Sequence, residues 1–314
     1  MDYTEKQVLQ GKAVLFLGAG ASYNCTDHEK KRIGFTGNEL LQKINEEFLG
    51  NTPNHLTLDF ASTMAIQKAG RENFDLFIKE LVCDFDPTNE HKLLSEFKWK
   101  AIFTTNYDEA IEKAYRENKS ALQKIEKIIS DNDSLQKVVV NPDKLPIVKI
   151  HGCISRPNDA RTPLVISCSD YRRHQENRSS LYQYLKECLT SDLVIFYGYG
   201  LGDNNIVGIL DDLEKEGVNR TRHIWLDPFM DEMYKDYWES KNLLCKVNNL
   251  YDFLSEIKSK QDSNILSLNN VLKNDSVISK LIPSNDRPSN ELEKYLLKQL
   301  LYVEMTDEIK RESD

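Results

Sequence analysis

AVLFLGAGAS, at residues 13–22, is the stretch from which the fold is interpreted. Apolar residues lead directly into a Gly-x-Gly turn, the pattern by which a buried parallel strand meets a phosphate-binding loop. We expect Gly18 to allow the sharp turn and Gly20 to let the backbone approach a pyrophosphate. Ser22 would then stand near a helix start, with its hydroxyl facing an anion. The alternative is an ordinary strand-to-loop turn, because Tyr23 stands where the dinucleotide fingerprint has its third glycine.

The composition indicates a globular protein with a substantial core. The 314 residues are enough for one large α/β domain with an addition, or for two modest domains. The net charge of −9 argues against nucleic-acid binding through a broad basic surface, although a local pocket for a small anion remains compatible with it. We find no signal-peptide core and no stretch near the roughly 20 apolar residues that span a bilayer. A cytoplasmic protein without membrane contact is therefore expected.

The cysteines predict free thiols and no metal site. None of the six forms a Cys-x-x-Cys pair, the close spacing from which structural zinc sites usually draw ligands. Cys153 lies two residues after His151, so a Cys/His nucleophile pair is conceivable. Buried free thiols are the simpler expectation in a cytoplasmic chain.

Further strands are predicted at residues 99–105, 147–150, 192–196 and 223–226, each followed by polar residues or glycines. In open α/β sheets, ligands bind at the carboxyl ends of the strands. Local alternatives exist for every motif. Asn106 could cap a helix and Asp108 could favour its first turn. Asp227 could accept hydrogen bonds from a ribose or simply start a turn before Pro228.

Two other strand ends carry the remaining candidates. His151 follows a strand and precedes Gly152, although a lone histidine is often structural. The stretch YGYGLGDNN at residues 197–205 contains three glycines in five positions, so its backbone must come close to something. A ligand and a neighbouring loop both explain Gly198 and Gly200.

The chain is therefore expected to form an α/β fold, with a Rossmann-like parallel sheet flanked by helices. We assign residues 1–230 to one domain, with a helical insertion at about 51–98. Residues 231–314 are expected to form a helical C-terminal extension, since the pattern after 228 is helical. Its amphipathic stretches at 265–281 and 292–303 could pack on their own domain or on another copy.

The motifs at four strand ends, in this order, resemble the sirtuin fold over about residues 10–230. The resemblance implies that Gly18, Ala19, Gly20 and Ser22 cradle the NAD pyrophosphate. It places Thr105, Asn106 and Asp108 near the nicotinamide and its ribose. It makes His151 the general base, and it gives Gly198 and Gly200 the adenosine side. Asp227 is added only from its place at a strand end.

Departures from the sirtuin pattern narrow the activity. The paired cysteines of the deacylating sirtuins are missing, and IGFTG at residues 33–37 replaces their acyl-lysine loop motif. The chain looks more like the zinc-free sirtuin-like domains of bacterial antiphage defence proteins, which hydrolyse NAD. The resemblance implies an NAD glycohydrolase that uses Asn106, Asp108 and His151, takes NAD as substrate and needs no metal.

Two other functions remain open at this point. One is an NAD-dependent protein deacylase or ADP-ribosyltransferase in the same pocket, and the other is a non-catalytic sensor of NAD or ADP-ribose. A toxic NADase needs control, so we expect a homo-oligomer or a partner. In the resembled family such partners include helicase-like ATPases and Argonaute-type proteins.

Overall fold

The computed structural model describes residues 2–29, 31–50, 56–157, 159–200, 202–217 and 221–272, with side chains as far as residue 263. The chain divides into two compact units, residues 1–254 and residues 255–314. Only the first turns of the second unit belong to the described part. The predicted amphipathic stretches at 265–281 and 292–303 lie outside the residues whose side chains are described.

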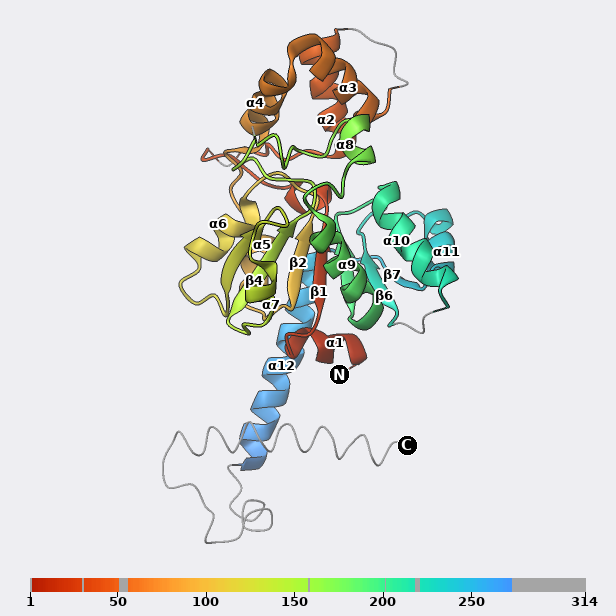
Figure 1. Ribbon diagram of the computed structural model, residues 1–314. Coiled ribbons are helices and arrows are strands. Elements are labelled where there is room, and N and C mark those ends of the chain that lie inside the picture. Colours follow the sequence, from red (N-terminus) through yellow and green to blue (C-terminus); the bar gives the residue numbers. More distant parts are fainter. Residues whose placement is uncertain are drawn as a thin grey trace. The chain divides into compact units, whose positions relative to one another are not determined.

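The first unit is built on a parallel sheet (Figure 1). Its strands are β1 (Val14–Leu17), β2 (Ala101–Thr104), β3 (Lys124–Ile128), β4 (Lys144–Lys149), β5 (Val194–Tyr197), β6 (His223–Leu226) and β7 (Leu243–Lys246). The strand order is β3-β4-β2-β1-β5-β6-β7, and every neighbouring pair is parallel. The Rossmann-like α/β fold predicted from the sequence is confirmed. The chain runs to one side of β1 through β2 and to the other through β5, which makes β1 the switch point of the sheet.

Helices connect the strands and cover the faces of the sheet. They are α1 (Tyr3–Leu9), η1 (Ala19–Ser22), α2 (Gly37–Ile44), η2 (Asn45–Leu49), α3 (Leu58–Ala69), α4 (Arg71–Val82), α5 (Asn89–Leu94), α6 (Ala110–Glu117), α7 (Leu135–Val139), α8 (Cys168–Arg172), α9 (Ser179–Ser191), α10 (Asn204–Lys215), α11 (Glu232–Ser240) and α12 (Leu250–Leu272). Among these helices, none is both long enough and apolar enough to cross a bilayer.

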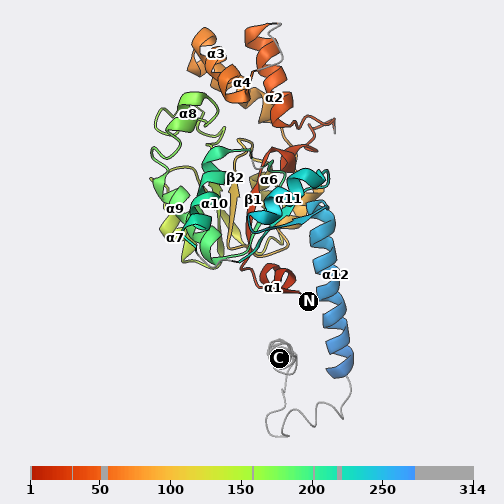
Figure 2. The same ribbon diagram turned by 90° about the vertical axis from the view of Figure 1, so that its right-hand side faces the viewer.

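The core lies where alternate strand residues meet the helices. Val14 and Phe16 of β1 face the cluster that α7, α9 and α10 complete, and Figure 2 shows α7 and α9 together on one side of β1 and β2. Because successive side chains of a strand point to opposite faces, Leu15 and Leu17 face the other side. All four residues are fully buried, which is why β1 has a continuous apolar sequence.

The sequence missed the two edge strands. The sequence predicts no strand at residues 124–128 and a helical pattern after residue 228, whereas the structure contains β3 and β7 there. Both lie at the outer edges of the sheet. Glu126 and Lys127 on β3 are only half-buried, so this strand lacks the apolar run that identifies an inner strand.

A helical group made of α2, α3 and α4 lies beyond the carboxyl ends of the strands (Figure 1). The group starts at α2, before the expected insertion at about 51–98, because α2 packs on α3. It does not include α5, which packs on α6. Arg71 joins the group to the segment that follows β4: its Nη1 lies 3.0 Å from Asp170 Oδ1, and its Nη2 donates to the Leu164 carbonyl at 2.8 Å. The group therefore lies over the edge of the sheet that carries the predicted site.

Candidate functional site

Neighbouring strand ends bring together most of the predicted site residues. The order β4-β2-β1-β5 places four carboxyl ends side by side along one edge of the sheet. Gly18 follows β1, Asn106 follows β2, His151 follows β4 and Gly198 follows β5. The motifs are far apart in sequence, and the parallel topology lines them up.

A chain of buried hydrogen bonds fixes Asn106. Its Nδ2 donates to the Gly18 carbonyl at 2.9 Å and to Ser22 Oγ at 3.0 Å. Ser22 Oγ in turn donates to Asp108 Oδ2 at 2.9 Å. Both amide protons of Asn106 are thus used within the protein, which leaves Oδ1 as the atom that can meet a ligand, as an acceptor.

Ser22 and Asp108 consequently act on Asn106 more directly than on an anion. The Ser22 hydroxyl proton is engaged by Asp108, and the backbone N–H of Ala110 donates to Asp108 Oδ1 at 2.9 Å at the start of α6. All three hydrogen-bonded side chains are buried. These contacts fit two roles for Asp108: it organises Asn106 through Ser22, and it starts α6. Its carboxylate also lies close to the turn after β2.

A buried lysine holds this turn from the β4 side. The Lys149 ammonium donates to the Asp108 backbone carbonyl and lies 3.2 Å from Glu112 Oε1. Both side chains of the ion pair are almost fully buried. Burial acts to lower the pKa of Lys149, but the carboxylate of Glu112 and neighbouring negative groups raise it above its usual range. The turn after β2 is therefore tied to a permanently charged amine, a contact that the apolar pattern of β4 does not reveal.

The glycines of the two Gly-rich turns meet each other. Gly20 N donates to the Gly198 carbonyl at 2.8 Å, and Gly18 N donates to the Tyr197 carbonyl at 3.0 Å. A Cβ on Gly18 would lie 2.5 Å from the Gly198 carbonyl oxygen, and one on Gly20 would lie 2.7 Å from Gly198 Cα. Of the two explanations for the turn after β5, a neighbouring loop accounts for Gly198. At Gly200 a Cβ would meet nothing within 4 Å.

These contacts affect the phosphate-binding interpretation. The backbone N–H groups of Gly18 and Gly20 already have backbone acceptors, so a phosphate at this turn would depend on other donors. Ala19 is exposed at the start of η1, and Thr105 is half-buried with its N–H donating to the Leu17 carbonyl at 3.2 Å. Their contacts with NAD stay predictions.

Asp227 lies apart from the Asn106 cluster. It follows β6, beyond β5 in the sheet, and its Oδ1 accepts a hydrogen bond from Phe229 N at 2.8 Å. This is the turn-starting contact that the following proline suggested. The ribose contact that was also considered for Asp227 stays a prediction.

His151 is buried at the end of β4 and faces a residue that the sequence analysis did not select. Its Nε2 lies 2.9 Å from Asp203 Oδ2, and its ring packs edge-on against Tyr171 with centroids 5.6 Å apart. Asp203 follows the Gly-rich turn of β5 and caps α10. An acid that starts a helix is common, which is why this position gave no separate signal.

Cys153 lies in a cluster with two glutamates, whereas His151 faces Asp203. Among the described residues, the ligand atoms of Glu109, Glu112 and Cys153 lie within 4.8 Å of one another. Glu109 is ion-paired with Lys127 and Glu112 with Lys149, so lysines already balance both carboxylates. The described cysteines are all free thiols, as expected.

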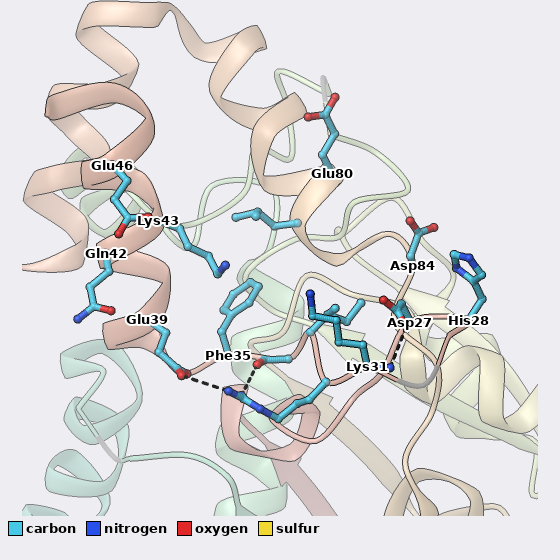
Figure 3. A pocket seen from close by; sticks show the side chains of 14 residues that line it. Asp27, His28, Lys31, Phe35, Glu39, Gln42, Lys43, Glu46, Glu80 and Asp84 are labelled. Atoms are coloured by element: carbon cyan, nitrogen blue, oxygen red, sulfur yellow. Dashed lines mark hydrogen bonds and ion pairs between the residues drawn. The ribbon is translucent and has the colours of Figure 1, made fainter.

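A cavity of about 630 Å³ lies between the loop after η1 and the helices α2 and α4, and its lining includes none of the predicted site residues (Figure 3). Acidic, basic and apolar side chains line it, among them Asp27, Lys31, Arg32, Phe35, Glu39, Lys43, Glu80 and Asp84. Arg32 fixes the loop: its Nη1 donates to the Gly34 carbonyl at 2.7 Å, and its guanidinium lies 4.5 Å from the centroid of the Tyr23 ring. The loop after η1 is thus anchored next to the end of the first glycine turn.

Comparison with known proteins agrees with these strand-end motifs. Residues 100–245 match the family model of the SIR2-like domain, a range that includes Asn106, Asp108, His151 and Asp203. Over this range the chain is similar to a SIR2-like domain. The matched range runs from the start of β2 into β7 and includes the turn after β5.

Proteins similar to this chain include a defence-associated sirtuin and NAD(+) hydrolases. The chain is 26% identical over 285 residues to Defense-associated sirtuin 2 of Bacillus subtilis, covering 85% of this chain and 27% of that protein. It is 28% identical over 215 residues to NAD(+) hydrolase ThsA of Bacillus cereus (strain MSX-D12), covering 67% of this chain and 41% of that protein. It is 26% identical over 215 residues to NAD(+) hydrolase ThsA of Acinetobacter baumannii (strain 532279), with the same coverage of 67% and 41%. The expected resemblance to sirtuin-like domains of bacterial defence proteins is confirmed, and the chain spans well under half the length of each of these relatives.

Proposed function

We propose that this SIR2-like domain hydrolyses NAD to nicotinamide and ADP-ribose. The observation that carries the proposal is the fixed Asn106 acceptor at the same sheet edge as the buried His151. Relatives named NAD(+) hydrolase support the choice of substrate. The edge also lies at the switch point of the sheet, where open α/β folds bind nucleotides.

Asn106 is suited to hold the attacking water or a ribose hydroxyl. Its Oδ1 can accept a hydrogen bond from either group, while Gly18 and Ser22 keep the amide from rotating. The bond that breaks joins the nicotinamide nitrogen to C1′ of the ribose. Nicotinamide leaves with the electron pair, and positive charge develops on the sugar in the transition state. A preorganised acceptor and the nearby Asp108 carboxylate lower the barrier by positioning and electrostatics.

His151 supplies the base. Water oxygen bonds to C1′ as nicotinamide departs, and the proton of that water moves to the imidazole. A neutral imidazole carries one free nitrogen for this purpose near neutral pH. General-base catalysis typically contributes about 100- to 10,000-fold, which sets the loss expected when the imidazole is removed.

The test is the release of nicotinamide and ADP-ribose from NAD by the purified chain, followed by chromatography. We expect His151→Ala and Asn106→Ala each to lower kcat by about 100-fold or more. Asn73→Ala is the matched control, because Asn73 is exposed on α4 and its Nδ2 donates to the Ala69 carbonyl at the end of α3, at 2.8 Å. NAD that stays intact with the wild-type chain in every assembly state, or full activity of His151→Ala, would overturn the proposal.

The same assay separates the other functions. Hydrolysis that needs an added acylated peptide would identify a deacylase, and transfer of ADP-ribose to protein would identify a transferase. NAD binding that survives His151→Ala, with no turnover by the wild type, would identify a sensor.

We further infer that the activity depletes NAD in antiphage defence and is controlled by assembly. The name of the Bacillus subtilis relative supports the defence setting. The amphipathic stretches expected within residues 231–314 motivate the proposal of control by assembly. The controlling contact would be a homo-oligomer or a partner such as a helicase-like ATPase or an Argonaute-type protein. Light scattering of the full chain and of a chain ending at residue 262 tests this. An unchanged monomer in both samples, with equal NAD turnover, would contradict it.

A further inference from the structure

The loops after β4 and β5 meet through His151 and Asp203. His151 Nε2 lies 2.9 Å from Asp203 Oδ2, and the two side chains are 5% and 7% exposed. In the sheet, β2 and β1 stand between β4 and β5. The contact therefore connects two loops that follow strands on either side of those that carry Asn106 and the first glycine turn, and both side chains are buried.

The rest of the Asp203 side chain is held in place independently of His151. Its Oδ1 accepts a hydrogen bond from Asn205 N at 2.9 Å, the N-cap contact of α10. The Asn205 side chain donates from Nδ2 to the Tyr171 carbonyl at 3.2 Å, and the Tyr171 ring packs edge-on against His151. One framework thus supports the imidazole both at its ring edge and at Nε2.

Asp203 faces His151 as a carboxylate. Burial acts to raise the pKa of Asp203, but the contact with the His151 imidazole and the Asn205 N–H lower it below its usual range. The other titratable groups around Asp203 are Tyr107, Tyr171, Tyr182, Tyr199 and His174. Burial raises the pKa of each of these tyrosines, so they stay neutral at neutral pH.

A carboxylate only accepts hydrogen bonds, so the 2.9 Å approach of Asp203 favours a proton on the His151 nitrogen that faces it. In the neutral ring the other nitrogen is then free. We propose that Asp203 is a positioning residue that holds His151 in its Nε2–H tautomer, so that Nδ1 takes the proton in NAD hydrolysis. The proposal rests on the function proposed above, and its logic is that of the carboxylate that orients the histidine in hydrolase triads.

Asp203→Asn tests the kinetic side of the proposal. Asparagine is as good an N-cap as aspartate, so α10 keeps its start while the charge is lost. The amide then offers a donor to the imidazole, which favours the Nδ1–H tautomer and occupies the nitrogen that should act as base. We expect kcat to fall about tenfold or more with little change in KM. The upper limit is the loss of the whole general-base contribution, about 100- to 10,000-fold. Unchanged kcat would overturn the proposal.

Asp231→Asn is the matched control. Asp231 caps α11 in the same way, with Met233 N donating to its Oδ1 at 2.8 Å, and it is exposed. We expect this variant to keep the wild-type kcat and KM, and thermal unfolding of both variants checks that the caps survive. A loss in the control equal to that in Asp203→Asn would assign the effect to capping and overturn the positioning role.

A spectroscopic measurement separates this proposal from the hydrolase proposal. The ¹⁵N shifts of labelled histidine at about pH 8, above the usual titration range of imidazole, report the tautomer without substrate. His151→Gln identifies the signals. We expect the Nε2–H tautomer in the wild type and the Nδ1–H tautomer in Asp203→Asn. The same tautomer in both proteins would overturn the positioning role even if NAD is hydrolysed, and a switched tautomer would stand even if NAD proves not to be the substrate.

Discussion

The contact between the two glycine turns leads to a quantitative prediction for Gly198→Ala. Gly198 has a φ of +62°, in the left-handed region that residues with a Cβ rarely occupy. A Cβ at this position would also lie 2.2 Å from Ala21 N and 2.6 Å from the Gly20 carbonyl carbon. These neighbours are backbone atoms at the start of η1, so they cannot move aside as a flexible side chain would. The substitution must shift the turn after β1 or the turn after β5.

The expected cost has two parts. The left-handed conformation costs about 1–2 kcal/mol for a residue with a Cβ. Crowding a packed region costs about 1–3 kcal/mol more. The free energy of unfolding should therefore fall by about 2–5 kcal/mol, a large share of the roughly 5–15 kcal/mol that stabilises a folded domain.

Urea unfolding followed by tryptophan fluorescence measures this loss. Trp225 reports on the region directly, because its Nε1 donates to the Tyr199 carbonyl at 3.1 Å. Gly200→Ala is the control, since a Cβ there meets nothing within 4 Å and its φ is outside the left-handed region. We expect the control to stay within about 1 kcal/mol of the wild type. A loss below about 1 kcal/mol for Gly198→Ala, or equal losses in both variants, would refute the packing argument.

Two further predictions concern buried and capping charges. Lys149→Met leaves Glu112 buried without its partner and should lower the free energy of unfolding by about 3–5 kcal/mol, measured by chemical denaturation. Combining Lys149→Met with Glu112→Leu should recover most of that loss. A double variant no more stable than the single one would contradict this. Asp131→Ala should cost about 1 kcal/mol at neutral pH, because Asp131 accepts hydrogen bonds from Ser179 and Ser180 at the start of α9. Partial burial acts to raise the pKa of Asp131, but these hydrogen bonds lower it, so its contribution is present above about pH 4 and is lost as the pH falls below that value. Thermal unfolding at neutral pH and near pH 3 should show the difference between wild type and variant shrinking in acid, and a difference independent of pH would be the contrary result.

The inner strands could be predicted from the sequence because they are buried on both faces. β1 and β5 are short, continuous apolar runs that end in glycine turns, and no other pattern fits such runs well. The edge strands gave no comparable signal. Glu126 and Lys127 on β3 are half-exposed and ion-paired, and β7 is only partly buried. An edge strand has a neighbour on one side only, so its sequence can stay polar.

By itself, the sequence determined which residues stand at the strand ends: Asn106, His151 and the glycines of the first and last turns. Local pattern suffices for that, because a strand and its end are defined by neighbouring residues. Only the tertiary structure decided what these residues meet. In the folded chain Gly20 contacts Gly198, and His151 lies next to Asp203. Both N–H groups of the Asn106 amide form hydrogen bonds within the protein. Such contacts depend on the strand order, which arises from packing of segments far apart in the chain and leaves no mark in the spacing of residues along it.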